Sequence, residues 1–118
     1  MIRILLVEDE MLLRELMYEE LSDSGFTVTP AATGDEALRV MHADIRFDLL
    51  LTDIRMPGET DGWALGRRAR EVIPSIRIIY ATGYTDGGPQ LGEHERSISK
   101  PFRHEQILGL IGDLGILR

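Results

Sequence analysis

The sequence predicts an α/β fold in which a parallel sheet of five strands carries helices on both faces. Apolar runs of strand length alternate with longer segments whose apolar residues recur at helical spacing. Alternation of this kind is typical of doubly wound parallel sheets with right-handed crossovers. The first and third runs are almost entirely apolar, as in strands that are buried on both faces. The expected strands are 2–7, 26–31, 47–52, 76–81 and a weak fifth at 98–99.

The helical segments begin and end at local signals. Thr33 or Asp35 can cap the second helix, and Asp61 can cap the third. The Ser24-Gly25 pair ends the first helix and Pro74 ends the third, while the last helix covers 102–114. The residues expected on the buried helical faces are Leu13, Leu16, Met17, Leu21, Ala37, Leu38, Met41, Leu65, Ala69, Val72, Ile107, Leu110, Ile111 and Leu114.

One crossover lacks the helix that the pattern requires. Between the fourth and fifth strands the chain reads Asp86-Gly87-Gly88-Pro89-Gln90-Leu91-Gly92. Glycine and proline are the strongest helix breakers, so we expect a loop or distorted turns over 86–93. The fourth helix of the fold is therefore predicted to be shortened or disordered.

Composition narrows the class of protein. A chain of 118 residues with 43% apolar residues is expected to form a single domain over 1–118. It has no cysteine, which fits a reducing cytoplasm, and no apolar run of membrane-spanning length. The formal charge of −7 argues against nucleic-acid binding. We expect a cytoplasmic protein that binds neither nucleic acid nor membrane.

Charged residues follow three of the expected strands. Glu8 and Asp9 follow the first, Asp53 follows the third, and Lys100 follows the fifth. Taken singly, each has an ordinary explanation as a solvated strand end, a helix cap or a surface lysine. In an open parallel sheet, however, the carboxyl ends of the strands face one crevice where ligands bind. Three carboxylates gathered there would offer the oxygen ligands that Mg²⁺ prefers.

Four motifs together resemble the receiver domain of two-component response regulators. They are the acidic pair Glu8-Asp9, the sequence Asp53-Ile54-Arg55-Met56-Pro57-Gly58, Thr82 at the end of the fourth strand, and Lys100-Pro101-Phe102. Their order and spacing match over the entire chain. The resemblance implies the strand order 2-1-3-4-5 and phosphorelay signal transduction as the function.

The resemblance also implies roles for individual residues. Asp53 matches the phosphoacceptor, which takes its phosphoryl group from a histidine kinase or a phosphotransfer protein. Glu8, Asp9, Asp53 and the backbone carbonyl of Arg55 match the Mg²⁺ ligands. Thr82 matches the hydroxyl that binds a phosphoryl oxygen, Lys100 matches the lysine that pairs with the phosphoryl group, and Pro101 follows a cis peptide bond. Such a domain catalyses its own phosphorylation and dephosphorylation without being an enzyme for another substrate.

The sequence departs from the family pattern in three places. The loop Gly58-Glu59-Thr60-Asp61-Gly62 is one residue longer than usual. Ser97 stands where a switch aromatic is common, and the stretch from Thr82 to Lys100 is short. With Tyr80-Ala81-Thr82-Gly83-Tyr84, these features resemble the atypical single-domain subfamily marked by Phe-Ala-Thr-Gly-x-Tyr.

Several alternatives stay open at this point. The domain could switch the binding of a downstream protein, or serve as a phosphate sink with no effector. It could be a monomer or a weak homodimer that pairs through the last helix. A Mg²⁺-dependent aspartyl-phosphate phosphatase would use a similar carboxylate cluster, but it usually has a second acid where Arg55 stands. A flavin-binding domain would need a phosphate-cradling loop where Glu8, Asp9 and Glu10 stand.

Overall fold

A five-stranded parallel sheet forms the centre of the protein. The computed structural model describes residues 1–83 and 90–116. In spatial order the sheet is β2-β1-β3-β4-β5, with all four pairings parallel. The predicted fold class and strand order are confirmed. The strands are β1 (Arg3–Val7), β2 (Thr27–Ala31), β3 (Leu49–Asp53), β4 (Arg77–Thr82) and β5 (Glu95–Ser99).

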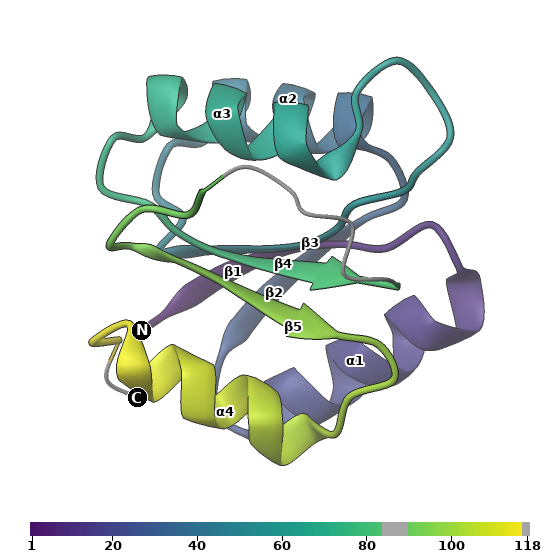
Figure 1. Cartoon of the computed structure of the whole chain (residues 1–118), viewed down its shortest axis with the longest axis vertical. Coiled ribbons are helices and arrows are strands. Elements are labelled where there is room, and N and C mark those ends of the chain that lie inside the picture. The colour runs from purple at the N-terminus through teal and green to yellow at the C-terminus, as the bar shows by residue number, and fades with distance from the viewer. Residues whose placement is uncertain (84–89, 117–118) are drawn as a thin grey trace.

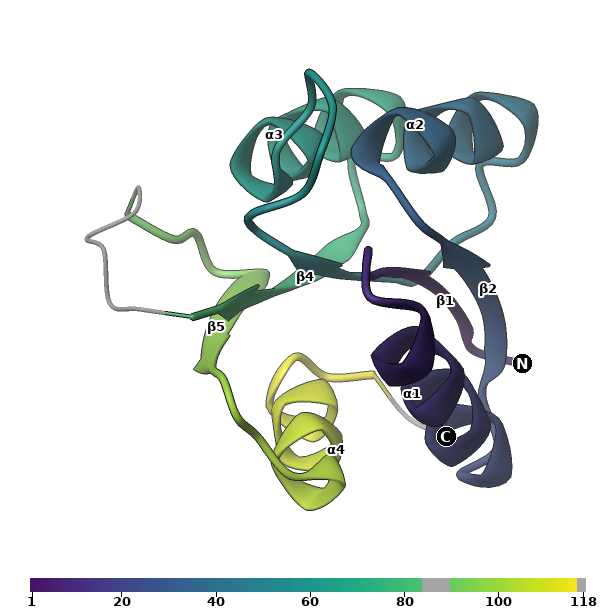
Figure 2. The same cartoon turned by 90° about the vertical axis from the view of Figure 1, so that its right-hand side faces the viewer.

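Helices cover both faces of the sheet (Figures 1 and 2). One face carries α2 (Gly34–Ala43) and α3 (Gly62–Val72), and the other carries α1 (Met11–Asp23) and α4 (His104–Asp113). Successive side chains of a strand point to opposite faces, so each face has a separate apolar core. Leu5 and Leu50 belong to the core under α2 and α3, whereas Ile4 and Leu51 belong to the core over α1 and α4.

Two helices begin at the caps that the sequence predicts. The Thr33 side chain accepts a hydrogen bond of 3.0 Å from the Glu36 backbone N–H at the start of α2. The Asp61 carboxylate accepts one of 2.8 Å from the Ala64 N–H at the start of α3. Each cap satisfies an amide that has no partner within its own helix. These caps fix where both helices begin, directly beside the ends of β2 and β3.

Two expectations differ from the structure. The fifth strand is longer than predicted and begins at Glu95, because β5 is an edge strand whose polar residues conceal the apolar pattern. The helical spacing placed Leu16 on the buried face of the first helix, yet Leu16 is 52% exposed while Met17 and Leu21 are buried. The apolar stripe of α1 is therefore narrower than the spacing suggested.

The connection from β4 to β5 contains no helix within the part that the structure describes, residues 83 and 90–94. The rest of the expected loop, residues 84–89, lies outside the described residues, and Tyr84 lies there too. Leu91 packs against the core under α2 and α3. Within its described residues, this connection thus contributes an apolar contact and forms no helix.

A buried carboxylate holds the end of this connection. Glu95, 5% exposed, accepts a hydrogen bond of 2.7 Å from the Gly92 N–H and one of 3.3 Å from the Tyr80 hydroxyl. Its Oε2 atom also lies 3.5 Å from the Arg70 guanidinium on α3. Burial and the Glu95 charge raise the pKa of Tyr80, so the phenol stays protonated and donates. Glu95 therefore ties β4, β5 and α3 together.

None of the helices within residues 1–83 and 90–116 combines the length and apolar composition needed to span a bilayer.

Candidate functional site

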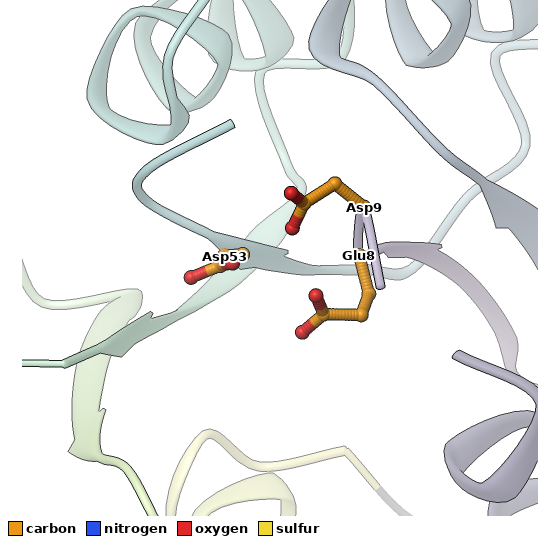
Figure 3. Close-up of side chains that lie close together, drawn as sticks. All are labelled: Glu8, Asp9 and Asp53. Atoms are coloured by element: carbon orange, nitrogen blue, oxygen red, sulfur yellow. The ribbon is translucent and has the colours of Figure 1, made fainter. Parts of the chain in front are cut away.

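Three carboxylates meet at the carboxyl end of the sheet (Figure 3). Glu8 and Asp9 directly follow β1, and Asp53 is the last residue of β3. These strands are neighbours, with Val7 paired to Thr52, so their ends lie side by side. One carboxylate oxygen from each residue lies within 4.8 Å of the others. The fold thus brings Asp53 to an acidic pair that lies 44 and 45 residues earlier in the chain.

Burial is graded across this cluster of Glu8, Asp9 and Asp53. Glu8 is 3% exposed, Asp53 is half-buried and Asp9 is exposed. The Glu8 Oε2 atom accepts a hydrogen bond of 3.0 Å from the Glu10 backbone N–H. The Asp53 Oδ1 atom accepts one of 2.9 Å from the Ile54 N–H. In both residues a backbone amide fixes one oxygen, which leaves the other for a cation.

Lys100 supplies that cation from the chain after β5. Its Nζ atom lies 3.1 Å from Glu8 Oε1 and 3.1 Å from Asp53 Oδ2. Its backbone N–H donates a hydrogen bond of 2.7 Å to the Thr82 carbonyl at the end of β4. The peptide bond from Lys100 to Pro101 is cis. One ammonium is therefore shared by the carboxylates of buried Glu8 and half-buried Asp53, and its residue is hydrogen-bonded to the neighbouring strand.

The charges in this cluster do not balance. Burial raises the pKa of both the Glu8 and the Asp53 carboxyl, and Lys100 opposes the rise in each case. Burial alone would lower the pKa of Lys100, but its bonds to Glu8 and Asp53 outweigh burial and raise it. One ammonium thus faces one buried and one half-buried acid, with exposed Asp9 beside them. Three carboxyl groups thus have one ammonium between them, and binding a further cation would offset the remaining negative charge.

The donor set fits Mg²⁺. This ion takes oxygen ligands at about 2.0–2.1 Å in octahedral geometry and keeps several waters. Ligands bound in that way lie roughly 3–4 Å apart, close to the spread of the three oxygens, which is within 4.8 Å. All of the donors are carboxylates, and one of them, Asp9, is open to solvent. The three carboxylates are therefore suitable in chemistry and spacing as donors for a Mg²⁺ ion.

The start of α3 approaches the end of β3 very closely. The Gly62 N–H donates a hydrogen bond of 2.8 Å to the Ile54 carbonyl. A Cβ atom at Gly62 would lie only 2.3 Å from the Asp53 carbonyl oxygen and 2.5 Å from the Ile54 Cα atom. Glycine at this position therefore sets how near the helix can come to Asp53.

Thr82 and Arg55, the remaining predicted site residues, lie on segments next to this cluster, whereas Ser97 and His104 do not belong to it. Thr82 is half-buried at the end of β4, and its backbone carbonyl accepts the hydrogen bond from the Lys100 N–H. Arg55 lies in the loop that follows Asp53, and its side chain is exposed. Ser97 is exposed and pairs in register with Tyr80. His104 contacts Ser24 beyond the far end of α1, away from the acids that precede that helix.

Sequence reasoning missed two residues that support the cluster. The Arg14 guanidinium donates a hydrogen bond of 2.8 Å to the Glu8 backbone carbonyl. The available signal was a basic residue in the first turn of the helix that directly follows the acidic pair. Gly62 was also missed, and its signal was a glycine immediately after the predicted cap Asp61.

Comparisons with known proteins agree with this geometry. The family model of the response regulator receiver domain matches residues 4–111. The response regulator receiver protein CpdR of Brucella abortus is 35% identical over 113 residues, which are 92% of each chain. The sensor kinase CckA of the same organism is 39% identical over 84 residues, 70% of this chain but 9% of the kinase.

A solved structure extends the comparison. The response regulator TrrA from Thermotoga maritima, in complex with Mg²⁺–BeF, superposes with a TM-score of 0.84 at 31% identity and covers 97% of this chain and 99% of that one. The phosphatase and flavin-binding alternatives gain no support from these matches. The family model spans nearly the whole sheet, and the strand order agrees. The chain therefore belongs to the response regulator receiver family of two-component systems, whose members accept a phosphoryl group on an aspartate.

Proposed function

We propose that Asp53 is the phosphoacceptor. The observation that carries this assignment is the contact of 3.1 Å between Lys100 Nζ and Asp53 Oδ2. It places a cation where the negative charge of a transferring phosphoryl group would develop, and such preorganised charge lowers the barrier. Among the three clustered acids, Asp53 alone is the last residue of a central strand. Glu8 is likewise held by a backbone amide and the lysine, but it is almost fully buried, whereas Asp53 is only half-buried.

The residues around the cluster fit Mg²⁺ as the resident metal. Glu8, Asp9 and Asp53 would hold it through carboxylate oxygens, together with the backbone carbonyl of Arg55. When bound, the ion neutralises charge on the phosphoryl oxygens and lets buried Asp53 stay ionised. Glu8 also keeps Lys100 oriented, since its Oε1 atom lies 3.1 Å from the ammonium.

The transfer itself requires little of the protein beyond placement. An ionised oxygen of Asp53 forms a bond to phosphorus while the phosphorus–nitrogen bond of a phosphohistidine breaks, and the electron pair leaves with the imidazole. Lys100 pairs with the phosphoryl group, and the Thr82 hydroxyl donates to one of its oxygens. Hydrolysis of the acyl phosphate by water at the same site would return Asp53 to its carboxylate.

The donor is proposed to be a histidine kinase or a phosphotransfer protein in the cytoplasm. The motivating comparison is CckA, a sensor kinase that contains a segment similar to this chain. Phosphorylation would then switch the binding of a downstream protein. The single-domain subfamily of atypical receivers stays a prediction, because Tyr84 lies outside the described residues.

Intact-mass measurement tests the phosphoacceptor directly. The protein is incubated with MgCl₂ and acetyl phosphate as the parent chain, as Asp53→Asn, and as the control Asp23→Asn at the exposed end of α1. The parent and the control are expected to gain the mass of one phosphoryl group, and Asp53→Asn is expected to gain nothing. A gain that persists in Asp53→Asn would assign the phosphoryl group to another residue.

An apolar surface beside the site is expected to contact the protein donor. Leu12 and Leu16 lie on one face of α1 and are 70% and 52% exposed. Leu12→Asp is expected to slow transfer from a phosphorylated donor protein by roughly tenfold, as loss of an interface anchor does. Labelling by acetyl phosphate should not change, since that donor needs no protein surface.

Ile45→Asp is the matched control for this surface. Ile45 is 61% exposed and lies between α2 and β3, at the opposite end of the sheet from Asp53. Stopped-flow or quench measurements of transfer would compare the variants. Equal slowing by Leu12→Asp and Ile45→Asp would show a general charge effect and not a docking surface on α1.

A further inference from the structure

The loop between β3 and α3, residues 54–61, is fastened to the start of α2. The Thr60 hydroxyl donates a hydrogen bond of 2.6 Å to Asp35 Oδ1. The contact spans 25 residues of sequence, and both side chains are half-buried. Gly34, beside Asp35, allows the approach, because a Cβ atom there would lie 2.5 Å from the Thr60 carbonyl oxygen. This is the loop that is one residue longer than the usual family pattern.

Asp35 meets the same loop at a second point. Its Oδ2 atom lies 3.1 Å from where a Cβ atom of Gly58 would stand, and Gly58 has φ of 102°. A side chain at Gly58 would be both strained and crowded against the carboxylate. Pro57, Gly58 and Glu59 are otherwise exposed. Asp35 and Thr60 therefore provide a defined attachment for a segment that has little burial of its own.

The anchor at α2 is itself rigid. Glu36 accepts a hydrogen bond of 2.8 Å from the Ala32 N–H, while the Thr33 side chain caps the helix at the Glu36 N–H. The Thr33 cap and the bond from Ala32 to Glu36 together hold the first turn of α2 to the end of β2. One residue earlier, the Ala31 carbonyl accepts a hydrogen bond of 3.1 Å from the Glu8 N–H. Asp35, to which the loop is attached, is thus connected to Glu8 of the acidic pair through the short segment 31–35 and the bond from Glu8 to Ala31.

These contacts form a continuous path from one side of the acidic cluster to the other. The path runs from Glu8 through Ala31 and the first turn of α2 to Asp35, across to Thr60, and on to Gly62. From there the Gly62 N–H bonds to the Ile54 carbonyl, next to Asp53, at 2.8 Å. The loop between Ile54 and Thr60 carries Arg55. Thr60 to Asp35 is the one side-chain-to-side-chain bond among these links.

We propose that Thr60 and Asp35 are positioning residues for the cation site. Their hydrogen bond sets where the loop, and with it the Arg55 backbone carbonyl, lies relative to Asp53. The proposal rests on the assignment of Glu8, Asp9, Asp53 and the Arg55 carbonyl as Mg²⁺ ligands. Groups that hold metal ligands in place typically change metal affinity by 10- to 100-fold when they are removed.

Calorimetric titration with MgCl₂ alone tests the proposal without any phosphoryl donor. Thr60→Val keeps the side-chain shape and removes the donor, and we expect it to weaken Mg²⁺ binding by roughly tenfold. Thr60→Ser keeps the hydroxyl and should bind Mg²⁺ as the parent does. Thr29→Val, the same substitution on β2 and away from the loop, is the control for a general effect on the fold.

Asp35→Ala and the double variant give a second, independent measurement. Because Asp35→Ala removes the acceptor of the bond as Thr60→Val removes its donor, Asp35→Ala should weaken Mg²⁺ binding similarly, and the double variant should be no weaker than either single variant. Unchanged Mg²⁺ affinity in Thr60→Val and Asp35→Ala, or losses that add in full, would overturn the proposal. If the parent chain itself fails to bind Mg²⁺, the proposed metal ligands fail instead, so the two failures are distinguishable.

Discussion

Lys100→Met is expected to slow the phosphorylation of Asp53 by roughly 100- to 1,000-fold, the usual cost of removing one preorganised charge from a transition state. Methionine keeps most of the length of the side chain and removes the ammonium that lies 3.1 Å from both Glu8 and Asp53. Without it, only the Ile54 amide opposes the effect of burial, so the pKa of Asp53 rises further and a smaller fraction of the nucleophile is ionised. The rate is measured with acetyl phosphate at fixed MgCl₂ and neutral pH.

The control for this prediction is Arg68→Met, which removes a charge from the exposed face of α3. It should leave the rate within a factor of two of the parent. A Lys100→Met rate within fivefold of the parent would contradict the role assigned to the ammonium. Lys100→Arg adds a further test, since a guanidinium keeps the charge but its planar fork does not reproduce the compact ammonium.

Gly62→Ala is expected to destabilise the fold by roughly 2–3 kcal/mol, in the range of overpacking substitutions. The new methyl group would meet backbone atoms, at 2.3 Å from the Asp53 carbonyl oxygen and 2.5 Å from the Ile54 Cα atom, so the start of α3 has to move. The same shift should disturb Asp53 and slow its phosphorylation. Urea unfolding monitored by circular dichroism gives the free energy of unfolding.

Gly109→Ala is the matched control and is expected to have the opposite sign. Gly109 lies within α4, and a Cβ atom there would meet nothing within 4 Å. Alanine favours the helix over glycine by about 0.5–1 kcal/mol, so this variant should be slightly more stable than the parent. Destabilisation of equal size in both variants would show that close approach at Gly62 is not the cause.

The sequence predicted the elements of this fold where local chemistry determines them. Strands buried on both faces, such as β1 and β3, show as continuous apolar runs, and the caps Thr33 and Asp61 show as residue types at helix starts. The meeting of Glu8, Asp9 and Asp53 could also be expected, since the ends of adjacent parallel strands share one edge. Each of these features follows from one segment and a general rule of topology.

The sequence could not predict side-chain contacts between distant segments, because no motif or spacing in either segment indicates its partner. Glu95 is a charged residue inside a strand, and only the Tyr80 hydroxyl, Gly92 amide and Arg70 guanidinium around it explain its burial. The bond from Thr60 to Asp35 joins two ordinary polar residues 25 positions apart. Such pairs depend on the final packing of loops and helices, which neither spacing nor propensity encodes.

Lys100 has a consequence for when the protein can work. The acidic residues belong to the first half of the chain, whereas the ammonium that they share comes from position 100 of 118. During synthesis, a chain that has not yet emerged beyond β5 has the acids without their counter-ion, and burying them together is then unfavourable. From the role proposed for Lys100, we expect the chain to become able to accept a phosphoryl group only when the last strand has formed, so that an incompletely folded chain does not compete with finished molecules for the donor.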